Sequence, residues 1–385
     1  MSEMSYLEKL LDGVEVEWLP LGHIAAIKTG QSVNKNMISK NPGVYPVINS
    51  GREPLGFINT WNTDNDPIGI TTRGAGVGSV IWQEGKYFRG NLNYSITIDK
   101  KNHINIRYMY HALLHMKNDI HELCTFDGIP ALNAGSLKKL LIPIPCPDNP
   151  EKSLAIQSEI VRILDKFTAL TAELTAELTA ELNMRKKQYN YYRDQLLSFK
   201  EGEVEWKTLG EVAVIGTGNH DTQDAIEHGK YIFYARGREP LKLNVFDFDE
   251  TAIITAGDGA GVGKVFHYAK GKYALHQRAY RIVPNAFMNP RFVYHYITAY
   301  FFTYIQKASV SSSVTSLRRP MFLKFPIPVP PSEEQARIVE ILDKFDTLTN
   351  SITEGLPREI ELRQKQYEYY RDLLFSFPKP ETVSN

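Results

Sequence analysis

The sequence has little cysteine: only Cys124 and Cys146 among 385 residues. Two cysteines in unrelated contexts exclude a disulfide framework and a cysteine-rich zinc site, and favour a cytoplasmic protein. The sequence also has no run of about 18 apolar residues, so no membrane span is expected. Residues 1–11 contain acids and no apolar core, so they are not expected to be a secretory signal.

Net charge is absent as well, because 44 Lys and Arg balance 44 Asp and Glu. The distribution is uneven. Residues 20–150 hold 13 basic against 9 acidic side chains, residues 207–330 hold 15 against 9, and the remainder holds 16 against 26. Mildly basic segments suit contacts with nucleic-acid phosphates, and acidic connectors suit a protein partner. Ordinary scatter of charge is the alternative explanation.

Catalytic motifs are missing too. There is no Gly-x-x-x-x-Gly-Lys-Ser/Thr loop, no Asn-Pro-Pro-aromatic motif for adenine methylation, and no discernible Ser/His/Asp set. His111 and His115 have the helical spacing of a metalloprotease pair, but Ala112 stands where that pattern needs Glu. We therefore expect packed or solvated histidines, and neither a metal site nor an active site.

What the sequence does contain is a tandem duplication. Seven blocks recur in one order: Val-Glu-Trp at 16 and 204, Thr-Gly at 29 and 217, Gly-Arg-Glu-Pro-Leu at 51 and 237, Gly-Ala-Gly-Val-Gly at 74 and 259, Ile/Phe-Pro-Ile-Pro at 142 and 325, Ile-Leu-Asp-Lys-Phe at 163 and 341, and Lys-Gln-Tyr with Tyr-Tyr-Arg-Asp at 187 and 365. The offset falls from 188 to 178 along the chain and is constant in the last two blocks. Duplication predicts a pseudo-two-fold molecule.

The first segment of each repeat is predicted to be mixed α/β. Short apolar runs at 69–72 and 79–82 are bounded by turn residues and indicate strands. Helices are predicted at 107–123 and 290–307. The Pro-alternating strips at 142–147 and 325–331 predict an extended linker or edge, because proline fixes φ and removes a donor.

The Gly-Ala-Gly-Val-Gly loops are poor candidates for nucleotide binding. A dinucleotide fingerprint needs a helix directly after the glycines, whereas residues 79–82 and 264–267 look like strands. Two alternatives stay open for these loops: a tight turn that approaches a DNA phosphate, or a purely structural turn.

The second segment of each repeat is predicted to be a long helix, at 151–199 and 332–377. The second helix should break at 354–357, since Gly followed by Pro disfavours continuation. The first carries tandem Thr-Ala-Glu-Leu units over 171–182 instead, and about 45 helical residues span roughly 65–70 Å. Two such helices favour an antiparallel, coiled-coil-like spacer.

The four-residue units have a mechanical interpretation. Each adds about 6 Å of rise and about 40° of rotation to an α-helix. One base pair of B-DNA adds about 3.4 Å and roughly 34–36°. One unit would therefore shift the distance between two read sites by about one base pair. The alternative is low-complexity helix filler. The residues predicted to set the spacer are Leu170, Leu174, Leu178, Leu182, Gly355 and Pro357.

With these features the chain resembles the specificity subunit of type I restriction–modification systems, over essentially its whole length. The resemblance rests on the duplicated module-plus-helix layout, the paired Ile-Leu-Asp-Lys-Phe blocks and the Lys-Gln-Tyr and Tyr-Tyr-Arg-Asp blocks. The tandem Thr-Ala-Glu-Leu units make the chain resemble, more narrowly, the IC-like group of these subunits. In that group the number of units sets the length of the unread spacer in the DNA site.

The resemblance implies a non-catalytic subunit with two target-recognition domains, each reading one half of a bipartite, asymmetric site in double-stranded DNA. It implies that the helices bind two methyltransferase subunits and that restriction subunits join the full complex. S-adenosylmethionine, ATP and Mg are expected in those partner subunits, and no cofactor in this chain.

Base reading favours Arg, Asn, Gln, Ser and Thr on loops, since these side chains distinguish base edges in the major groove. The first-module candidates are Asn49, Ser50, Arg52, Thr72, Arg73, Arg89, Asn91 and Asn93. The second-module candidates are Arg236, Arg238, His276, Gln277, Arg278, Ser311, Ser312, Ser313, Arg318 and Arg319. Arg52 and Arg238 lie in a shared block, so they grip phosphate or pair with Glu53 and Glu239 instead of reading bases.

The predicted fold is thus α+β, with two pseudo-symmetric α/β target-recognition domains joined by two long antiparallel helices. The predicted divisions are a first domain at 1–150, a central helix at 151–200, a second domain at 201–331 and a C-terminal helix at 332–385. Two other functions stay open: a catalytic DNA methyltransferase or nuclease, and a helical scaffold without DNA readout.

Overall fold

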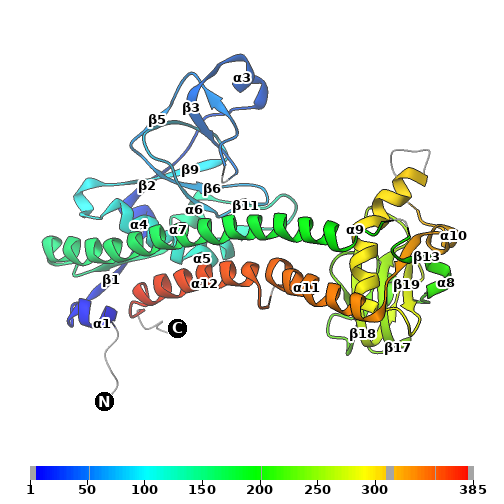
Figure 1. Cartoon of the computed structure of the whole chain (residues 1–385). Helices are drawn as coiled ribbons and strands as arrows, with labels where there is room; N and C mark the ends of the chain where they lie inside the picture. Colours follow the sequence, from blue (N-terminus) through cyan, green and yellow to red (C-terminus); the bar gives the residue numbers. More distant parts are fainter. Residues whose placement is uncertain (1–5, 52, 201, 309–315, 352, 380–385) are drawn as a thin grey trace. The chain divides into compact units, whose positions relative to one another are not determined.

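A computed structural model describes residues 6–51, 53–200, 202–308, 316–351 and 353–379 of the chain. It divides into two compact units, one of residues 1–176 with 361–385 and one of residues 177–360. Each unit combines one α/β module with parts of the long helices (Figure 1). No described helix is long and apolar enough to cross a membrane.

The first module contains two four-stranded sheets. One has the order β2 (Ala25–Thr29), β9 (Asn93–Ile98), β6 (Ile68–Thr71) and β7 (Val80–Trp82), all antiparallel. The other has the order β4 (Phe57–Ile58), β3 (Pro42–Ile48), β8 (Lys86–Arg89) and β5 (Thr63–Asp64), in which β3 and β8 run parallel. Short helices α2 (Leu21–Ile24), α3 (Lys35–Lys40) and α6 (Ala134–Leu137) and the hairpin β10 (Cys124–Thr125) to β11 (Ala131–Leu132) complete it.

The second module combines the equivalent strands in one six-stranded sheet. Its order is β14 (Ala213–Thr217), β19 (Ala279–Pro284), β17 (Phe248–Ala256), β18 (Phe266–Leu275), β15 (Tyr231–Tyr234) and β16 (Leu241–Leu243). The ten-residue β18 corresponds to the separate strands β7 and β8 of the first module. Continuity of this strand therefore explains why one module has one sheet and the other has two.

Both glycine-rich loops are followed by strands, β7 and β18, as expected from the sequence. This agrees with their exclusion as dinucleotide-binding loops, since no helix follows to present its N-terminus to phosphate. Gly74 and Gly78, like Gly259 and Gly263, have φ between 66° and 91°, which L side chains rarely adopt. These glycines are required by the turn itself.

The proline strips are strands that close each module. β12 (Leu141–Pro145) pairs antiparallel with β1 (Val16–Pro20), and β20 (Pro326–Val329) pairs antiparallel with β13 (Glu205–Thr208). Each pair forms a sheet of only two strands. Prolines are tolerated there because such strands have an unpaired edge. The expectation of an edge is confirmed, and the pairing places the two ends of each module side by side.

The predicted first module helix is two helices. α4 (Ile106–His115) and α5 (Lys117–Glu122) are separated at Met116, whereas α9 (Pro290–Ala308) is continuous. Asn105 caps α4 by accepting hydrogen bonds from the amides of Arg107 and Tyr108. The apolar faces of these helices pack on the sheets and complete the core of each module.

The long helices follow the sequence prediction closely. α7 (Pro150–Leu196) is 47 residues long and uninterrupted, and α11 (Ser332–Asn350) and α12 (Leu356–Leu374) are separate. A Cβ at Gly355 would lie 2.4 Å from the carbonyl oxygen of Thr347, so this turn needs glycine. Pro357 lies in the first turn of α12, where proline is tolerated. The predicted break is confirmed.

The helices run antiparallel within each unit. In the first unit Phe167 of α7 stacks on Tyr370 of α12 with ring centres 4.8 Å apart, and Leu164 shares a core cluster with Leu374 (Figure 1). In the second unit Tyr192 of α7 stacks on Phe345 of α11 at 5.5 Å. Leu197, just after α7, shares a cluster with Leu342 of α11. The repeated Tyr-Tyr-Arg-Asp and Ile-Leu-Asp-Lys-Phe blocks therefore meet in both units.

Candidate DNA-recognition edges and module–helix joints

The same two backbone bridges mark one edge of each module. In the first, Gln31 pairs with Gly90 and Arg73 with Ala131. In the second, His220 pairs with His276 and Asp258 with Ser316. We call the exposed loop residues around these bridges the reading edge of each module. The predicted candidates fall on or near it.

In the first module the structure separates the candidates into two groups. Arg73 and Asn91 are exposed and Ser50 is half-buried, so their side chains can reach a ligand. Asn49 and Thr72 are buried, and the Asn49 Oδ1 accepts the Leu92 amide at 2.9 Å. Arg52 lies outside the described residues.

Arg89 and Asn93 belong to the buried group. The prediction that they read bases is therefore corrected. The Arg89 side chain is only 3% exposed. Its guanidinium donates to the Asn93 Oδ1 at 2.6 Å, to the Asp66 carbonyl at 2.7 Å and to the Tyr87 hydroxyl. Burial lowers the pKa of Arg89 and raises that of Tyr87 to about 12. This network is internal, because a buried cation must be satisfied by nearby acceptors.

In the second module two predicted arginines meet at one carboxylate. Arg236 and Arg278 donate to the two oxygens of Asp258 at 3.0 and 3.1 Å. Burial raises the pKa of Asp258, but the hydrogen bonds from the two arginines outweigh it and leave the pKa below its ordinary value. Gln277 donates to Asp221 at 3.0 Å. The Arg278 side chain is still 62% exposed, so it can exchange this ion pair for a base or phosphate.

The other second-module candidates vary in exposure. Arg238, Arg318 and Arg319 are exposed, whereas His276 is 1% exposed and accepts the Arg278 amide through Nδ1. The prediction that His276 reads bases directly is therefore corrected, because its side chain is buried. Its hydrogen bond instead holds the backbone of Arg278. Ser311, Ser312 and Ser313 lie outside the described residues.

The equivalent positions of the two reading edges carry different chemistry. Arg73, a donor with positive charge, stands where the second module has Asp258, an acceptor with negative charge. Asn91 stands where the second module has Gln277. Two edges of equal backbone geometry and different side chains can present different hydrogen-bond patterns to DNA.

A joint that the sequence did not predict fixes each module to a long helix. In the first unit Asp165 of α7 accepts hydrogen bonds from Arg107 at 3.0 Å and from His111 at 2.8 Å. The Gln157 Oε1 accepts the Asn105 amide at 2.8 Å. Burial lowers the pKa of His111 despite its bond to Asp165.

The second unit repeats this joint. Asp343 of α11 accepts from Arg291 at 2.6 Å and from His295 at 2.7 Å, and the Gln335 Oε1 accepts the Asn289 amide at 2.7 Å. Burial raises the pKa of Asp343, but bonds from His295 and Arg291 outweigh it, and the pKa is lowered overall. The signal in the sequence was Asn-x-Arg with His four residues after the Arg, at 105–111 and 289–295.

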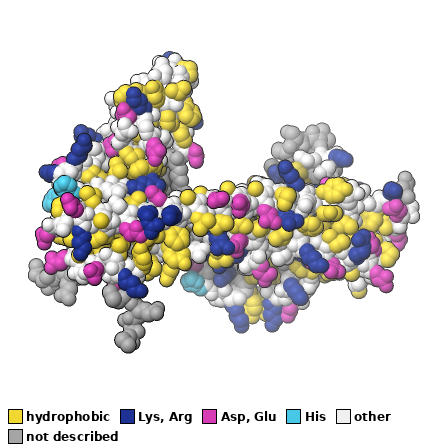
Figure 2. Space-filling model, turned by 60° about the vertical axis from the view of Figure 1, so that its left-hand side comes forward, with side chains coloured by type: hydrophobic (Ala, Val, Ile, Leu, Met, Phe, Trp, Pro, Cys, Tyr) yellow, Lys and Arg dark blue, Asp and Glu magenta, His cyan; other side chains and the backbone are white. Residues whose placement is uncertain are grey.

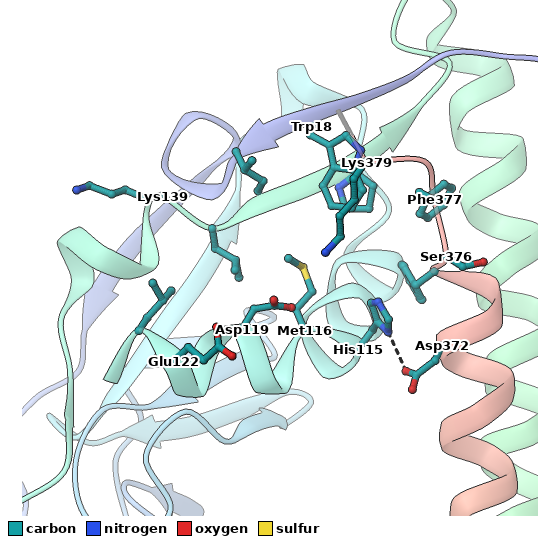
Figure 3. A pocket seen from close by; sticks show the side chains of 15 residues that line it. Trp18, His115, Met116, Asp119, Glu122, Lys139, Asp372, Ser376, Phe377 and Lys379 are labelled. Carbon is teal, nitrogen blue, oxygen red and sulfur yellow. Dashed lines mark hydrogen bonds and ion pairs between the residues drawn. The ribbon is translucent and has the colours of Figure 1, made fainter. Parts of the chain in front are cut away.

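Each module also holds the end of another helix. In the first unit a pocket of about 640 Å³ opens beside α5, β1, β12 and the segment after α12 (Figure 3). Trp18 donates to the Pro378 carbonyl at 2.8 Å, and His115 contacts Asp372 at 2.8 Å. In the second unit Phe199, just after α7, packs on Phe292. Both units thus repeat the contact between a helix end and a module.

Charged groups do not gather as a metal site in the part of the chain that the structure describes. Groups of three or more His, Cys, Asp or Glu side chains with suitable geometry are absent among these residues. The histidines predicted to be packed or solvated are accounted for: His111 is buried in the joint, and His115 faces Asp372.

The chain matches the family model of the type I restriction modification DNA specificity domain twice, over residues 13–184 and 201–362. It is 45% identical over 421 residues to the type I restriction enzyme EcoR124I/EcoR124II specificity subunit of Escherichia coli, with both chains covered completely. It is 37% identical to the EcoprrI specificity subunit of Escherichia coli, covering 92% of this chain and 93% of the relative.

Solved structures share the fold. The type I restriction–modification S subunit from M. genitalium aligns over 98% of this chain and 100% of its own, with a TM-score of 0.55 at 19% identity. A chain from a structure of type I R-M complex assembly aligns over 94% and 97%, with a TM-score of 0.59 at 14% identity. The duplicated modules, the paired helices and these matches lead to one conclusion: the chain belongs to the specificity subunits of type I restriction–modification systems, which are non-catalytic.

Proposed function

We propose that the two reading edges bind the two halves of a bipartite, asymmetric site in double-stranded DNA. The observation that carries this proposal is the pair of edges with equal backbone bridges and different side chains. The members that proteins or DNA can reach are the exposed Arg73, Asn91, Arg238, Gln277, Arg278, Arg318 and Arg319 and the half-buried Ser50 and Arg236. The edges are formed by domains at 1–150 and 201–331. Arginine and the amide side chains are the commonest specific readers of guanine and adenine.

Within this proposal the helices at 151–200 and 332–385 have two roles. The Thr-Ala-Glu-Leu units, as in the IC-like group, set the length of the unread spacer. The exposed faces of the helices bind two copies of a methyltransferase subunit. Tyr191 and Tyr369, at equivalent places in the two units, are 62% and 63% exposed, although large aromatic side chains gain most from burial. Identical exposed tyrosines fit two copies of one partner.

The remaining chemistry belongs to the partners. S-adenosylmethionine in the methyltransferase subunits supplies the methyl group for adenine, and ATP and Mg in the restriction subunits support cleavage. We place this assembly in the cytoplasm, where its DNA substrate lies.

The test is an exchange of one module. Replacing residues 20–150 with the matching segment of another specificity subunit should change one half-site and leave the other half-site and the spacer unchanged. Methylated adenines are mapped across the genome of cells that carry the hybrid and the methyltransferase subunit. A change in both half-sites, or methylation without any sequence preference, contradicts the proposal.

A further inference from the structure

Both modules cover an exposed aromatic ring with a lysine. The Lys86 Nζ lies 4.6 Å from the ring centre of Trp61, and the Lys272 Nζ lies 4.7 Å from that of Phe246. Both rings are 40% exposed. We call these two sites the lysine–aromatic pairs.

The backbone around the pairs is repeated as well. Each lysine follows a glycine with positive φ, 69° at Gly85 and 85° at Gly271. In the strand register Asp64 lies opposite Lys86, and Asp249 lies opposite Lys272. The two sites therefore share a lysine, an aromatic ring and a carboxylate in one arrangement.

The residue after each ring fixes the strand beside it. The Asn62 Oδ1 accepts the Arg89 amide at 2.7 Å, and the Asp247 Oδ2 accepts the Leu275 amide at 2.8 Å. These bonds hold the loops that carry Trp61 and Phe246 on β8 and β18. The rings are thus presented by a fixed framework.

The pairs contribute little to folding on their own. A cation–π contact at an exposed position is weak, because water competes with the ring for the cation. Further exposed apolar side chains occur in the same parts of the modules: Val44, Leu55 and Phe57 in the first, and Ile226, Ile232 and Val245 in the second. Figure 2 shows hydrophobic side chains on the surface of the first-module lobe that carries α3, β3 and β5. Apolar surface of this kind, rimmed by polar groups, is typical of protein interaction sites.

The partner must be the same for both modules. The reading edges differ, with Arg73 in one and Asp258 in the other, whereas the lysine–aromatic pairs are alike. Each lysine has a carboxylate opposite it in the register, so the site offers a DNA phosphate little net positive charge. An exposed ring at a site with little net charge matches a protein interface, in which aromatic residues are enriched and the rim is polar.

We propose that each lysine–aromatic pair is a contact for one methyltransferase subunit, separate from the helices. This inference rests on the proposed function, in which two such subunits assemble on the chain. The contact would hold each catalytic subunit against the module that reads its half-site, whatever bases that module reads.

The experiment measures the binding of purified methyltransferase subunit to the full-length chain without DNA. Trp61→Ala and Phe246→Ala should each weaken binding at one of the two sites about tenfold, as expected for truncation of an aromatic hot spot. Trp61→Phe should stay within about twofold of wild type, because it keeps a ring under Lys86.

Matched controls are exposed aromatics outside the pairs. Phe126→Ala serves for the first module, and Phe287→Ala serves for the second, where Lys207 lies 6.0 Å from the ring. Both should bind the subunit as wild type does. Thermal melting of every variant checks its folding.

Two outcomes overturn the inference. In the first, Trp61→Ala and Phe246→Ala bind the methyltransferase subunit with wild-type affinity but bind a DNA duplex more weakly. The pairs would then be part of the DNA-binding surface. In the second, the two variants bind the methyltransferase subunit with wild-type affinity but melt at a lower temperature. The pairs would then only stabilise the fold. Failure of the proposed function is distinguishable, because it appears in the wild-type complex as methylation without sequence preference.

Discussion

His111 lies with its Nε2 2.8 Å from the Oδ1 of Asp165, so a module helix and a long helix are joined by a histidine–carboxylate contact. His295 and Asp343 repeat this contact at 2.7 Å. Each aspartate also accepts an arginine, Arg107 or Arg291. The aspartates therefore carry the polar part of both joints.

Removing the charge of either aspartate should loosen its joint. Asp165→Asn and Asp343→Asn should each lower the free energy of unfolding by about 1–2 kcal/mol, since a hydrogen bond to a charged group contributes about 1.5–3 kcal/mol and partial exposure reduces this. Chemical denaturation measures the change. Lys344→Ala is the control, because its pair with Glu340 is exposed. Equal stability of wild type and both aspartate variants would contradict the role of the joints.

The first joint should also respond to pH. Burial lowers the pKa of His111, so the unfolded chain binds this proton more readily than the folded chain. Stability should therefore fall as the pH drops below about 6.5, the ordinary pKa of histidine. Melting temperatures between pH 7.5 and 5.5 should fall less in His111→Asn than in wild type. The exposed His228 supplies the control, and His228→Asn should keep the wild-type slope.

The turn between α11 and α12 should not tolerate a side chain at Gly355. The Cβ of Gly355→Ala would lie 2.4 Å from the Thr347 carbonyl oxygen and 2.8 Å from that of Leu348. Backbone atoms would have to shift, at a cost of about 1–3 kcal/mol. Thermal denaturation measures this loss. The neighbouring Glu354→Ala, on an exposed side chain, should melt within a degree or so of wild type.

The helical units should act as a ruler. Deleting residues 179–182 removes one Thr-Ala-Glu-Leu unit and should shorten the recognised spacer by about one base pair. Both half-sites should stay the same, as read from the methylation pattern in cells. A deletion of three residues, 180–182, is the control, because it rotates the helix out of register and should abolish methylation. Altered half-sites in the four-residue deletion would refute the ruler.

The exposed tyrosines should anchor the methyltransferase subunits to the helices. Tyr191→Ala or Tyr369→Ala should leave one subunit bound per chain, and the double variant should bind none at concentrations that saturate wild type. Native mass spectrometry counts the subunits. Met184→Ala, also on an exposed α7 side chain, is the matched control. Two bound subunits in the double variant would exclude these tyrosines as anchors.

The sequence predicted the repeating parts of the fold well. The seven blocks indicated two modules, and the helical period and the Gly355–Pro357 break predicted α7, α11 and α12 with ends a few residues from those observed. It did not predict the break at Met116 between α4 and α5. Nothing in the local sequence marks this break, since neither Gly nor Pro stands there.

The candidate site was predicted less completely. Residue type favoured Arg89, Asn93 and His276, but burial depends on strands that pair over long sequence distances, such as β6 with β9. The joints were missed because His111 was compared with a metalloprotease motif and not with its repeat at His295, and because Asn105 and Arg107 were not compared with their repeats at 289–291. Comparing the halves at every position would have found them.

The two-stranded pairs β1–β12 and β13–β20 also have a consequence for the evolution of such a chain by recombination. Because the first and last strands of a module lie side by side, the chain enters and leaves the module through one narrow seam. A crossover between two genes at the Val-Glu-Trp and Pro-Ile-Pro codons would replace everything beyond the seam and leave the seam itself intact. In a single step, the hybrid gene would encode a protein that still folds and that recognises a new DNA target.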